Sequence, residues 1–232
     1  MIELLLPAPV ACAEAFADMA GESCFPGEEH LIARAVPGRR AEFVTARRCA
    51  RTALGQLGFA PAPLLPGPRR DPRWPAGVTG SITHCRGYRA AAVALAGHAA
   101  GLGIDAEPHE PLPGGVAASI STAGERDTLR RLRHTDPAVH WDRLLFSAKE
   151  SIYKAWFPLT RHELDFGDAR LAIDPAGRTF AGHITAPAAG PVPRTMHGRY
   201  LVAAGLVVTV VLVPPGPTRR SSSAWSSGTP AR

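Results

Sequence analysis

AVHWDRLLFSAKESIYKAWF, residues 138–157, carries the clearest helical pattern in the chain. Its apolar side chains recur every three or four residues, which predicts an amphipathic helix with one buried stripe. The stripe consists of Trp141, Leu144, Leu145, Ala148, Ile152, Ala155 and Trp156. Arg143, Glu150 and Lys154 fall on the opposite face. Pro158 follows, and we expect the helix to end there because proline has no backbone N–H to donate.

Toward the N-terminus the pattern alternates between helical and extended segments. Two apolar runs flank a short turn containing Gly87, which predicts a β-hairpin, and a third run ends at Pro108. The predicted strands are 78–84, 88–96 and 101–107, and the predicted helices are 39–57 and a short one at 11–20. Residues 61–76 are rich in proline and arginine and predict an irregular connection.

The order of elements indicates two halves of similar build. A helix is predicted at 122–133 before the central one, and strands are predicted at 169–173, 180–185, 200–203 and 206–213. Helices and strands thus follow each other twice, which is typical of the α+β class. We predict an N-terminal half at 1–102, a C-terminal half at 103–213 and a disordered tail at 214–232, where Ser, Pro, Gly and Arg dominate.

Composition narrows the class of protein. The 232 residues carry a formal net charge of +6, which suits a polyanionic ligand, an acidic protein partner or nucleic acid. The most apolar stretch, 201–213, is too short to cross a bilayer, and the N-terminus shows no secretory leader. We therefore expect a cytoplasmic protein that does not bind membranes. The four cysteines have no CxxC spacing and are expected to be reduced thiols.

Two acidic motifs are candidates for chemistry. Alternation along a strand places Asp105 and Glu107 on one face, where two carboxylates suit a hard cation such as Mg²⁺. The alternative is a strand whose polar face meets solvent. Glu150 and Lys154 are spaced i,i+4 beside a further cation, Lys149; the alternative there is a solvated helix pair.

Basic residues form a third group of candidates. His84 lies at a predicted strand end, and arginines cluster on the helix predicted at 39–57, with Arg69 and Arg70 in the connection that follows. Forked guanidinium donors suit phosphate groups, although a run of charges is more often a solvated face.

Taken in order, these segments resemble one family. They read RRAEFVTARRCAR (39–51), GSITHCRGYRAAAVA (80–94), GIDAEP (103–108) and FSAKESIYKAWFPLT (146–160). Together they resemble the successive motifs of the Sfp-type 4′-phosphopantetheinyl transferases, especially the actinobacterial and enterobactin-synthetase-associated branch. The resemblance covers about residues 38–160, with a looser match in the C-terminal strands.

The resemblance implies a fold and a reaction. The family is a pseudo-dimer of two α+β halves that binds coenzyme A in the cleft between them. It transfers the phosphopantetheine arm to a serine of an apo carrier protein and releases 3′,5′-ADP. By resemblance, Asp105, Glu107 and Glu150 hold Mg²⁺, Glu150 takes the serine proton directly or through a metal-bound water, and Lys154 neutralises charge on phosphate.

The resemblance also implies a set of coenzyme-binding residues. Thr83 and His84 match positions that contact the 3′-phosphate and adenosine, and Arg39 and Arg47 match helix arginines that hold the same end. The member of each Arg-Arg pair that makes the contact stays open by one position. Arg69 or Arg70 supplies the loop cation; we choose Arg70, and add Lys149 to the set. The loop 108–119 and the helix after it are expected to meet the carrier protein, and we expect a monomer.

Two other functions compete with this one. Ser151-Ile152-Tyr153-Lys154 matches the S-x-x-K motif of penicillin-recognising serine acylases, but it lies inside a helix and neither SDN nor KTG follows. A basic nucleic-acid-binding module explains the arginines but not the two acidic motifs. The sequence leaves open whether the carrier is an acyl carrier, a polyketide synthase domain or a non-ribosomal peptide synthetase domain.

Overall fold

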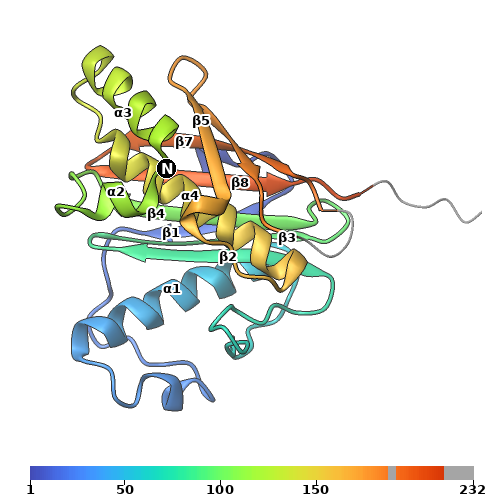
Figure 1. The fold of residues 1–232 in the computed structure, drawn as a ribbon. Helices are drawn as coiled ribbons and strands as arrows, with labels where there is room; N and C mark the ends of the chain where they lie inside the picture. The colour runs from blue at the N-terminus through green and yellow to red at the C-terminus, as the bar shows by residue number, and fades with distance from the viewer. Residues whose placement is uncertain (188–191, 217–232) are drawn as a thin grey trace, which may run out of the picture.

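The computed structural model describes residues 1–187 and 192–216, which form a mixed α+β structure with two antiparallel sheets (Figure 1). The smaller sheet has the order β1-β3-β2 and the larger one the order β4-β8-β7-β6-β5. The smaller sheet contains β1 (Ala11–Ala15), β2 (Val78–Cys85) and β3 (Tyr88–Leu95). The larger sheet contains β4 (Gly101–Pro108), β5 (Ala169–Asp174), β6 (Thr179–Ile184), β7 (Thr195–Ala203) and β8 (Leu206–Val213). The chain thus completes one sheet before it begins the other.

Each sheet is covered by one long helix. The α-helices are α1 (Pro37–Gln56), α2 (Val116–Ile120), α3 (Ala123–Thr135) and α4 (Trp141–Thr160), and the 3₁₀ helices are η1 (Ile2–Leu5), η2 (Glu29–Ile32) and η3 (Phe166–Asp168). α1 packs Ala50 and Leu54 into a core shared with Val93 of β3. α4 packs its apolar stripe, including Ile152, against Val211 of β8. In Figure 1, α1 lies below the smaller sheet and α4 crosses the larger one.

The two sheets meet where β2 lies beside β4. Each is the last strand of its own sheet, and side-chain hydroxyls of β2 bond to the backbone of β4. Ser81 Oγ accepts from the N–H of Ile104 at 3.1 Å, and Thr83 Oγ1 accepts from the N–H of Ala106 at 3.0 Å. Because buried N–H groups require partners, these two hydroxyls satisfy a strand edge that no backbone ladder covers. We refer to this contact as the seam.

Most predicted elements are confirmed, and four details are corrected. The helix predicted at 11–20 is wrong: Ala11–Ala15 form β1, because pairing with β3 and cover by α1 outweigh local preference. The predicted stop at Pro158 is also wrong, since α4 continues to Thr160 and Arg161 follows in a left-handed conformation. α2 lies where a loop was expected, and β7 begins earlier than predicted. Most of the predicted tail, 217–232, lies outside the described residues.

Within the part of the chain that the structure describes, no helix is long and apolar enough to cross a membrane.

Candidate active site

The seam places Asp105 at the centre of the candidate site. Asp105 lies on β4 and is 4% exposed. One of its carboxylate oxygens accepts from Lys154 Nζ of α4 at 2.7 Å and lies 3.4 Å from the hydroxyl of Thr83 on β2. Its other oxygen, Oδ2, is buried and has no hydrogen-bond partner among the described residues. A buried carboxylate oxygen without a partner is costly, so this oxygen is suited to receive a ligand or cation.

Glu107 lies on the same face of β4, two residues along the strand. Its carboxylate accepts from Arg143 Nη1 of α4 at 2.9 Å. Burial raises the pKa of Glu107, the nearby Asp105 carboxylate adds to this, and Arg143 offsets part of it. The two acids therefore repel each other as the strand alternation predicts.

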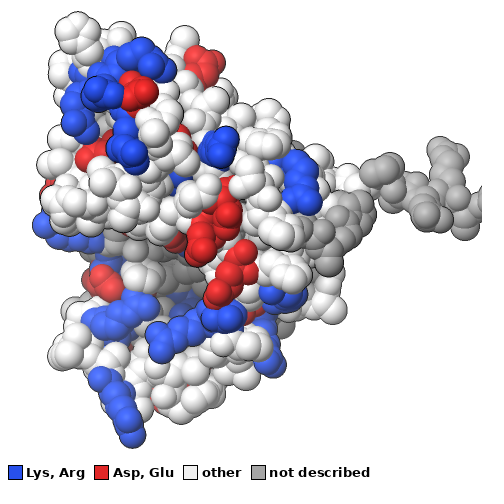
Figure 2. All heavy atoms as spheres, viewed as in Figure 1, with Lys and Arg blue, Asp and Glu red and all other residues white. Residues whose placement is uncertain are grey.

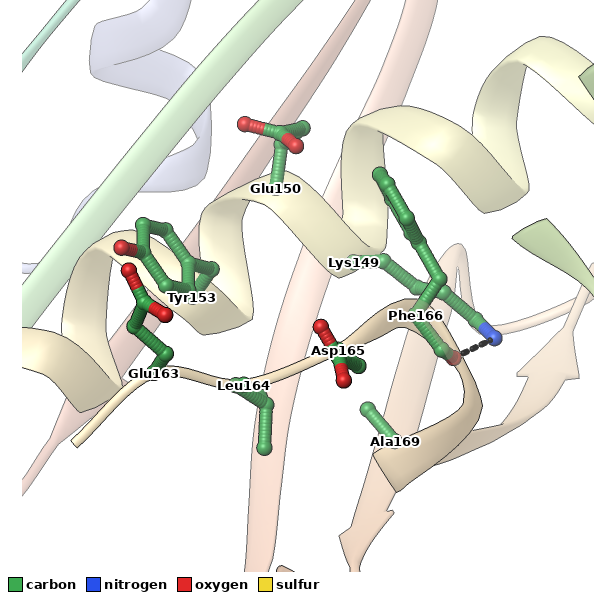
Figure 3. Close-up of a pocket in the computed structure, with 8 residues that line it drawn as sticks. All are labelled: Lys149, Glu150, Tyr153, Glu163, Leu164, Asp165, Phe166 and Ala169. Carbon is green, nitrogen blue, oxygen red and sulfur yellow. Dashed lines mark hydrogen bonds between the residues drawn. The ribbon is translucent and has the colours of Figure 1, made fainter. Parts of the chain in front are cut away.

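Glu150 is the third acid, one turn of α4 before Lys154, whose ammonium group donates to Asp105. Burial raises the pKa of Glu150; the charge of Lys154 offsets part of this rise, and the Asp105 carboxylate adds to it. Figure 3 shows the Glu150 side chain leaving α4 away from the ammonium group of Lys149. Among residues 1–187 and 192–216, no three His, Cys, Asp or Glu side chains converge into a ready-made metal site. The structure thus brings the acids into one region without joining them into one cluster.

Lys149, which was expected to join the coenzyme-binding set, lines a smaller pocket together with Glu150. Its ammonium group is buried and donates to the carbonyl oxygens of Ile120 at 2.8 Å and Phe166 at 2.7 Å, and to the Glu125 carboxylate at 3.0 Å. Figure 3 shows the contact with Phe166 as a dashed line. Glu125 also accepts from the backbone N–H groups of Thr122 and Leu171. Lys149 therefore joins α4 to α3 and to the segment before β5.

Basic side chains approach from the smaller sheet and its helix. Arg39 of α1 lies 2.7 Å from a ring nitrogen of His84 at the end of β2 and pairs with Glu42 at 3.2 Å. Burial lowers the pKa of His84, Arg39 lowers it further, and Glu42 opposes the change. An imidazole beside an arginine is well placed to share an anionic ligand with it.

Arg47 lies two turns further along α1. Its guanidinium lies over the ring of Phe43, 3.5 Å from the centroid, and its Nε donates to the carbonyl oxygen of Leu64 at 3.3 Å. Burial lowers the pKa of Arg47, the Glu28 carboxylate opposes this, and Arg51 lowers it further. The side chain is thus fixed in direction before any ligand arrives.

The connection between α1 and β2 crosses toward α4. Asp71 pairs with Arg161 at 3.0 Å, and Arg69 pairs with Glu163 at 2.6 Å. Arg70, between them, has a φ of +65°, in the left-handed region that non-glycine residues rarely adopt. Arg69 is paired with an acid, whereas Arg70 pairs with none in the described part of the chain.

Several of these side chains, but not Asp105, Glu107, Thr83 or Lys149, line one groove of about 1280 Å³. Arg39, Arg47, Arg70, His84, Glu150 and Lys154 all contribute to its wall. Figure 2 shows this face hollowed between the two parts of the molecule, with acidic side chains beside the hollow and basic ones along its lower side. A smaller pocket of about 280 Å³ shares Glu150 and Tyr153 with the groove. The groove therefore contains basic side chains, which suit phosphate, together with the carboxylate of Glu150.

Three residues of the site were not predicted from the sequence. Tyr153 lines both pockets, three residues after Glu150, and this helical spacing was a usable signal. Trp74 donates its ring N–H to the carbonyl oxygen of Gly80 at 2.9 Å and forms part of the groove wall. Gly103 has no visible signal: a Cβ there would overlap the carbonyl oxygen of Ser151, so only glycine lets β4 approach α4 this closely.

The structure argues against the serine acylase. Ser151 is fully buried, and its hydroxyl donates to the carbonyl oxygen of Ala148 at 2.9 Å. A nucleophile must reach its substrate, and this hydroxyl faces the packed side of α4.

Comparison with known proteins agrees with the geometry. Residues 27–94 match the family described as "4′-phosphopantetheinyl transferase N-terminal domain", and residues 101–209 match the "4′-phosphopantetheinyl transferase superfamily". The chain is 52% identical over 221 residues to 4′-phosphopantetheinyl transferase Svp of Streptomyces mobaraensis, covering 92% of this chain and 89% of Svp. It is 44% identical over 225 residues to 4′-phosphopantetheinyl transferase PptT of Mycobacterium tuberculosis, covering 92% and 98%. Enterobactin synthase component D of Salmonella typhi is 34% identical over 118 residues, covering 51% and 48%. The groove, its charges and these matches lead to one conclusion: the chain belongs to the 4′-phosphopantetheinyl transferase superfamily.

Proposed function

We propose that this enzyme binds coenzyme A in the groove and transfers its 4′-phosphopantetheine arm to a serine of an apo carrier protein, releasing 3′,5′-ADP. The observation that supports this most directly is the groove itself. It joins arginines of α1 to Glu150 and Lys154 of α4 in one cavity, so a phosphate-rich nucleotide and a general base share one space.

The nucleotide end of coenzyme A is assigned to the cationic part of the groove. Arg39 and His84 are already adjacent, and Arg47 points from the same helix into the cavity. Arg70 supplies the cation from the loop, while Thr83 holds the seam beneath them. Guanidinium groups form charge-assisted hydrogen bonds with phosphate oxygens and an imidazole N–H can donate a further bond, which gives the 3′-phosphate several partners at once.

A magnesium ion fits the three acids. Asp105 has a buried oxygen without a partner among the described residues. Burial raises the pKa of Glu107 and of Glu150, the Asp105 carboxylate adds to each rise, and a bound cation would offset both effects. Carboxylate oxygens are the ligands that Mg²⁺ prefers. Asp105, Glu107 and Glu150 would hold the ion. When bound, it supplies neutralisation of the pyrophosphate charge and orients the phosphorus for attack.

The chain's own groups perform the proton transfer. Glu150, whose pKa burial raises above the ordinary value, takes the proton of the carrier serine hydroxyl, which is otherwise a weak nucleophile. The serine oxygen forms a bond to the β-phosphorus as the bond to the bridging oxygen of the diphosphate breaks. The bond electrons leave with 3′,5′-ADP. Lys154, close to Asp105 at the floor of the site, neutralises charge on the phosphate oxygens.

The finer architecture follows from the division into two sheets. We infer that residues 1–102 and 103–213 form the two halves of a pseudo-dimer with the active site in the cleft between them. One chain supplies both walls of the groove, so we expect the enzyme to act as a monomer. The carrier is an acyl carrier, polyketide synthase or peptide synthetase domain, met by the segment 108–119 and the helix after it, in the cytoplasm where these substrates reside.

Mass spectrometry of apo carriers tests the proposal. Carriers of the three classes are incubated with the protein, coenzyme A and Mg²⁺, and at least one should gain the mass of phosphopantetheine while 3′,5′-ADP appears. Adding EDTA should stop the transfer. If no carrier gains that mass, or if the reaction proceeds unchanged in EDTA, the corresponding part of the proposal is wrong.

A further inference from the structure

Glu28 is a fully buried acid that the proposed reaction does not use. It precedes η2 and is 0% exposed. Its Oε1 accepts from Arg51 Nη1 of α1 at 2.9 Å and from the backbone N–H of Leu64 at 2.7 Å. Its Oε2 lies 3.9 Å from Arg47 Nε and has no hydrogen-bond partner among the described residues. A carboxylate can be buried this completely only where protein groups replace its interactions with water. Here two arginines and one backbone amide replace them.

The groups around Glu28 connect it to the groove. Arg47 lines the groove, and Leu64 holds it from the other side by accepting from its Nε. Leu64 also lies in the connection between α1 and β2 that carries Arg70. One carboxylate therefore touches both the helix and the loop that supply cations to the groove.

The contact between Glu28 and Arg47 is long, and this leaves Arg47 available. At 3.9 Å, Oε2 provides charge without taking a hydrogen bond from Nε, which Leu64 already receives. Among the described residues, the two terminal nitrogens of Arg47 have no recorded hydrogen-bond partner. Glu28 thus balances the neighbouring charges of Arg47 and Arg51 while the donors of Arg47 stay free for a ligand.

We infer that Glu28 is a positioning residue for coenzyme A, which acts through Arg47 and through the start of the loop at Leu64. The inference rests on the proposed function, because it assumes that coenzyme A occupies the groove. Without the negative charge, two arginines face each other in a poorly hydrated space, and the bonds that residue 28 accepts from Arg51 and from the N–H of Leu64 weaken. Arg47 then turns toward solvent, and the groove loses a pre-oriented donor.

Glu28→Gln tests this with little change of shape. We expect coenzyme A to bind at least about tenfold more weakly by calorimetry, while kcat at saturating coenzyme A stays within about twofold. Glu22→Gln is the matched control: Glu22 pairs with Arg48 of the same helix at 2.7 Å, and Arg48 does not line the groove. Normal affinity in Glu28→Gln, or an equal loss in Glu22→Gln, overturns the inference.

A double-mutant cycle tests whether the effect passes through Arg47. In an Arg47→Met background, Glu28→Gln should change coenzyme A affinity by less than about twofold, because the donor that it orients is gone. A full additional tenfold loss in that background shows that Glu28 acts by another route and overturns the inference.

Two further readouts keep the result interpretable. If Glu28→Gln does not fold, Glu28→Asp retains the charge but shortens the reach, and it should show the same loss and the same dependence on Arg47. Wild-type affinity for coenzyme A is measured first. A wild type that does not bind coenzyme A contradicts the proposed function, whereas a binding wild type with an equally strong Glu28→Gln contradicts only the role of Glu28.

Discussion

Lys149 and Glu150 are neighbours in sequence and opposites in environment. Lys149 is 3% exposed and bonded to three oxygens, while Glu150 lines the groove. The burial of Lys149 was predictable from helical periodicity, because Lys149 follows Leu145 by four residues and precedes Ile152 by three, and both belong to the apolar stripe. The acids at 105, 107 and 150 were predictable from alternation and from the resemblance. The buried ion pair of Lys149 with Glu125 was not, since no local pattern identifies a partner 24 residues away.

Glu150→Gln should stabilise the protein in the absence of Mg²⁺ and coenzyme A. The raised pKa of Glu150 means that its ionised form is disfavoured in the folded state. The cost is fully present at pH values above the folded-state pKa and disappears as the pH falls through that pKa toward the ordinary value of 4.5.

The thermal midpoints of Glu150→Gln and wild type, measured from pH 8 to pH 4, check this. The variant should melt higher at pH 8, the difference should shrink on acidification, and transfer activity should be lost. A difference that grows on acidification would contradict the buried, repelled carboxylate.

Arg70→Gly should separate stability from binding. A left-handed φ costs a non-glycine residue about 1–2 kcal/mol, so glycine at +65° should raise the free energy of unfolding by about 1 kcal/mol. Loss of the guanidinium should weaken coenzyme A binding about tenfold or more. Arg70→Ala is the control, because it removes the charge and keeps the strain: it should bind weakly without the gain in stability. Full affinity in both variants would remove Arg70 from the site.

At the scale of elements, the close approach of β4 to α4 sets the site's geometry. Gly101 and Gly103 both face α4, and the approach allows Lys154 to reach Asp105 at 2.7 Å. The identity of both elements was predictable from periodicity. The close approach of these two elements was not predictable. It depends on Gly101 and Gly103 having no side chain, and glycines in a sequence can equally indicate a turn. The helix predicted at 11–20 was wrong for a similar reason. Ala11–Ala15 form a strand because they pair with β3 and pack against α1, and neither contact is visible in the local sequence.

Gly103→Ala should push these elements apart. The added methyl group would overlap the carbonyl oxygen of Ser151 and lie 2.7 Å from the backbone nitrogen of Ala155, neither of which is a flexible group. Overpacking of this kind costs about 1–3 kcal/mol. We expect a lower unfolding midpoint in urea and a fall in kcat, because Lys154 and Asp105 separate.

Gly124→Ala supplies the matched control, since Gly124 lies in α3 with open space around its Cβ position. It should be neutral or stabilise by up to about 1 kcal/mol, because alanine favours helix more than glycine does. Equal stability of Gly103→Ala and Gly124→Ala would show that β4 and α4 can move apart freely.

At the scale of the molecule, each sheet carries different charged residues of the candidate site. The smaller sheet and α1 carry His84, Arg39 and Arg47, and the larger sheet and α4 carry the three acids and Lys154. The repeated order of helices and strands indicated two α+β units, and the division of the chain into halves near residue 102 stays a prediction. The way in which the halves join was not, because the joining residues, Ser81 and Thr83, are small polar side chains that look like any others in a strand.

Thr83→Val should weaken the join. Valine keeps the shape but leaves the N–H of Ala106 without an acceptor, which costs about 1–3 kcal/mol for a buried group. Hydrogen exchange at Ala106 should accelerate and transfer should slow. Thr83→Ser, which retains the hydroxyl, should restore both. Unchanged exchange in Thr83→Val would mean that water or another group replaces the hydroxyl.

The seam also fixes the position of β2 along β4. In a backbone ladder every residue can pair, so a strand that slides by two positions finds equivalent partners. Here only two hydroxyls, at alternate positions of β2, match two N–H groups at alternate positions of β4. A slide by two residues, about 7 Å along the strand, leaves one of them unmatched. In the proposed complex, Ser81 and Thr83 therefore fix the distance between the basic side chains of the smaller sheet and α1 and the acids of the larger sheet and α4, so that this spacing matches one length of coenzyme.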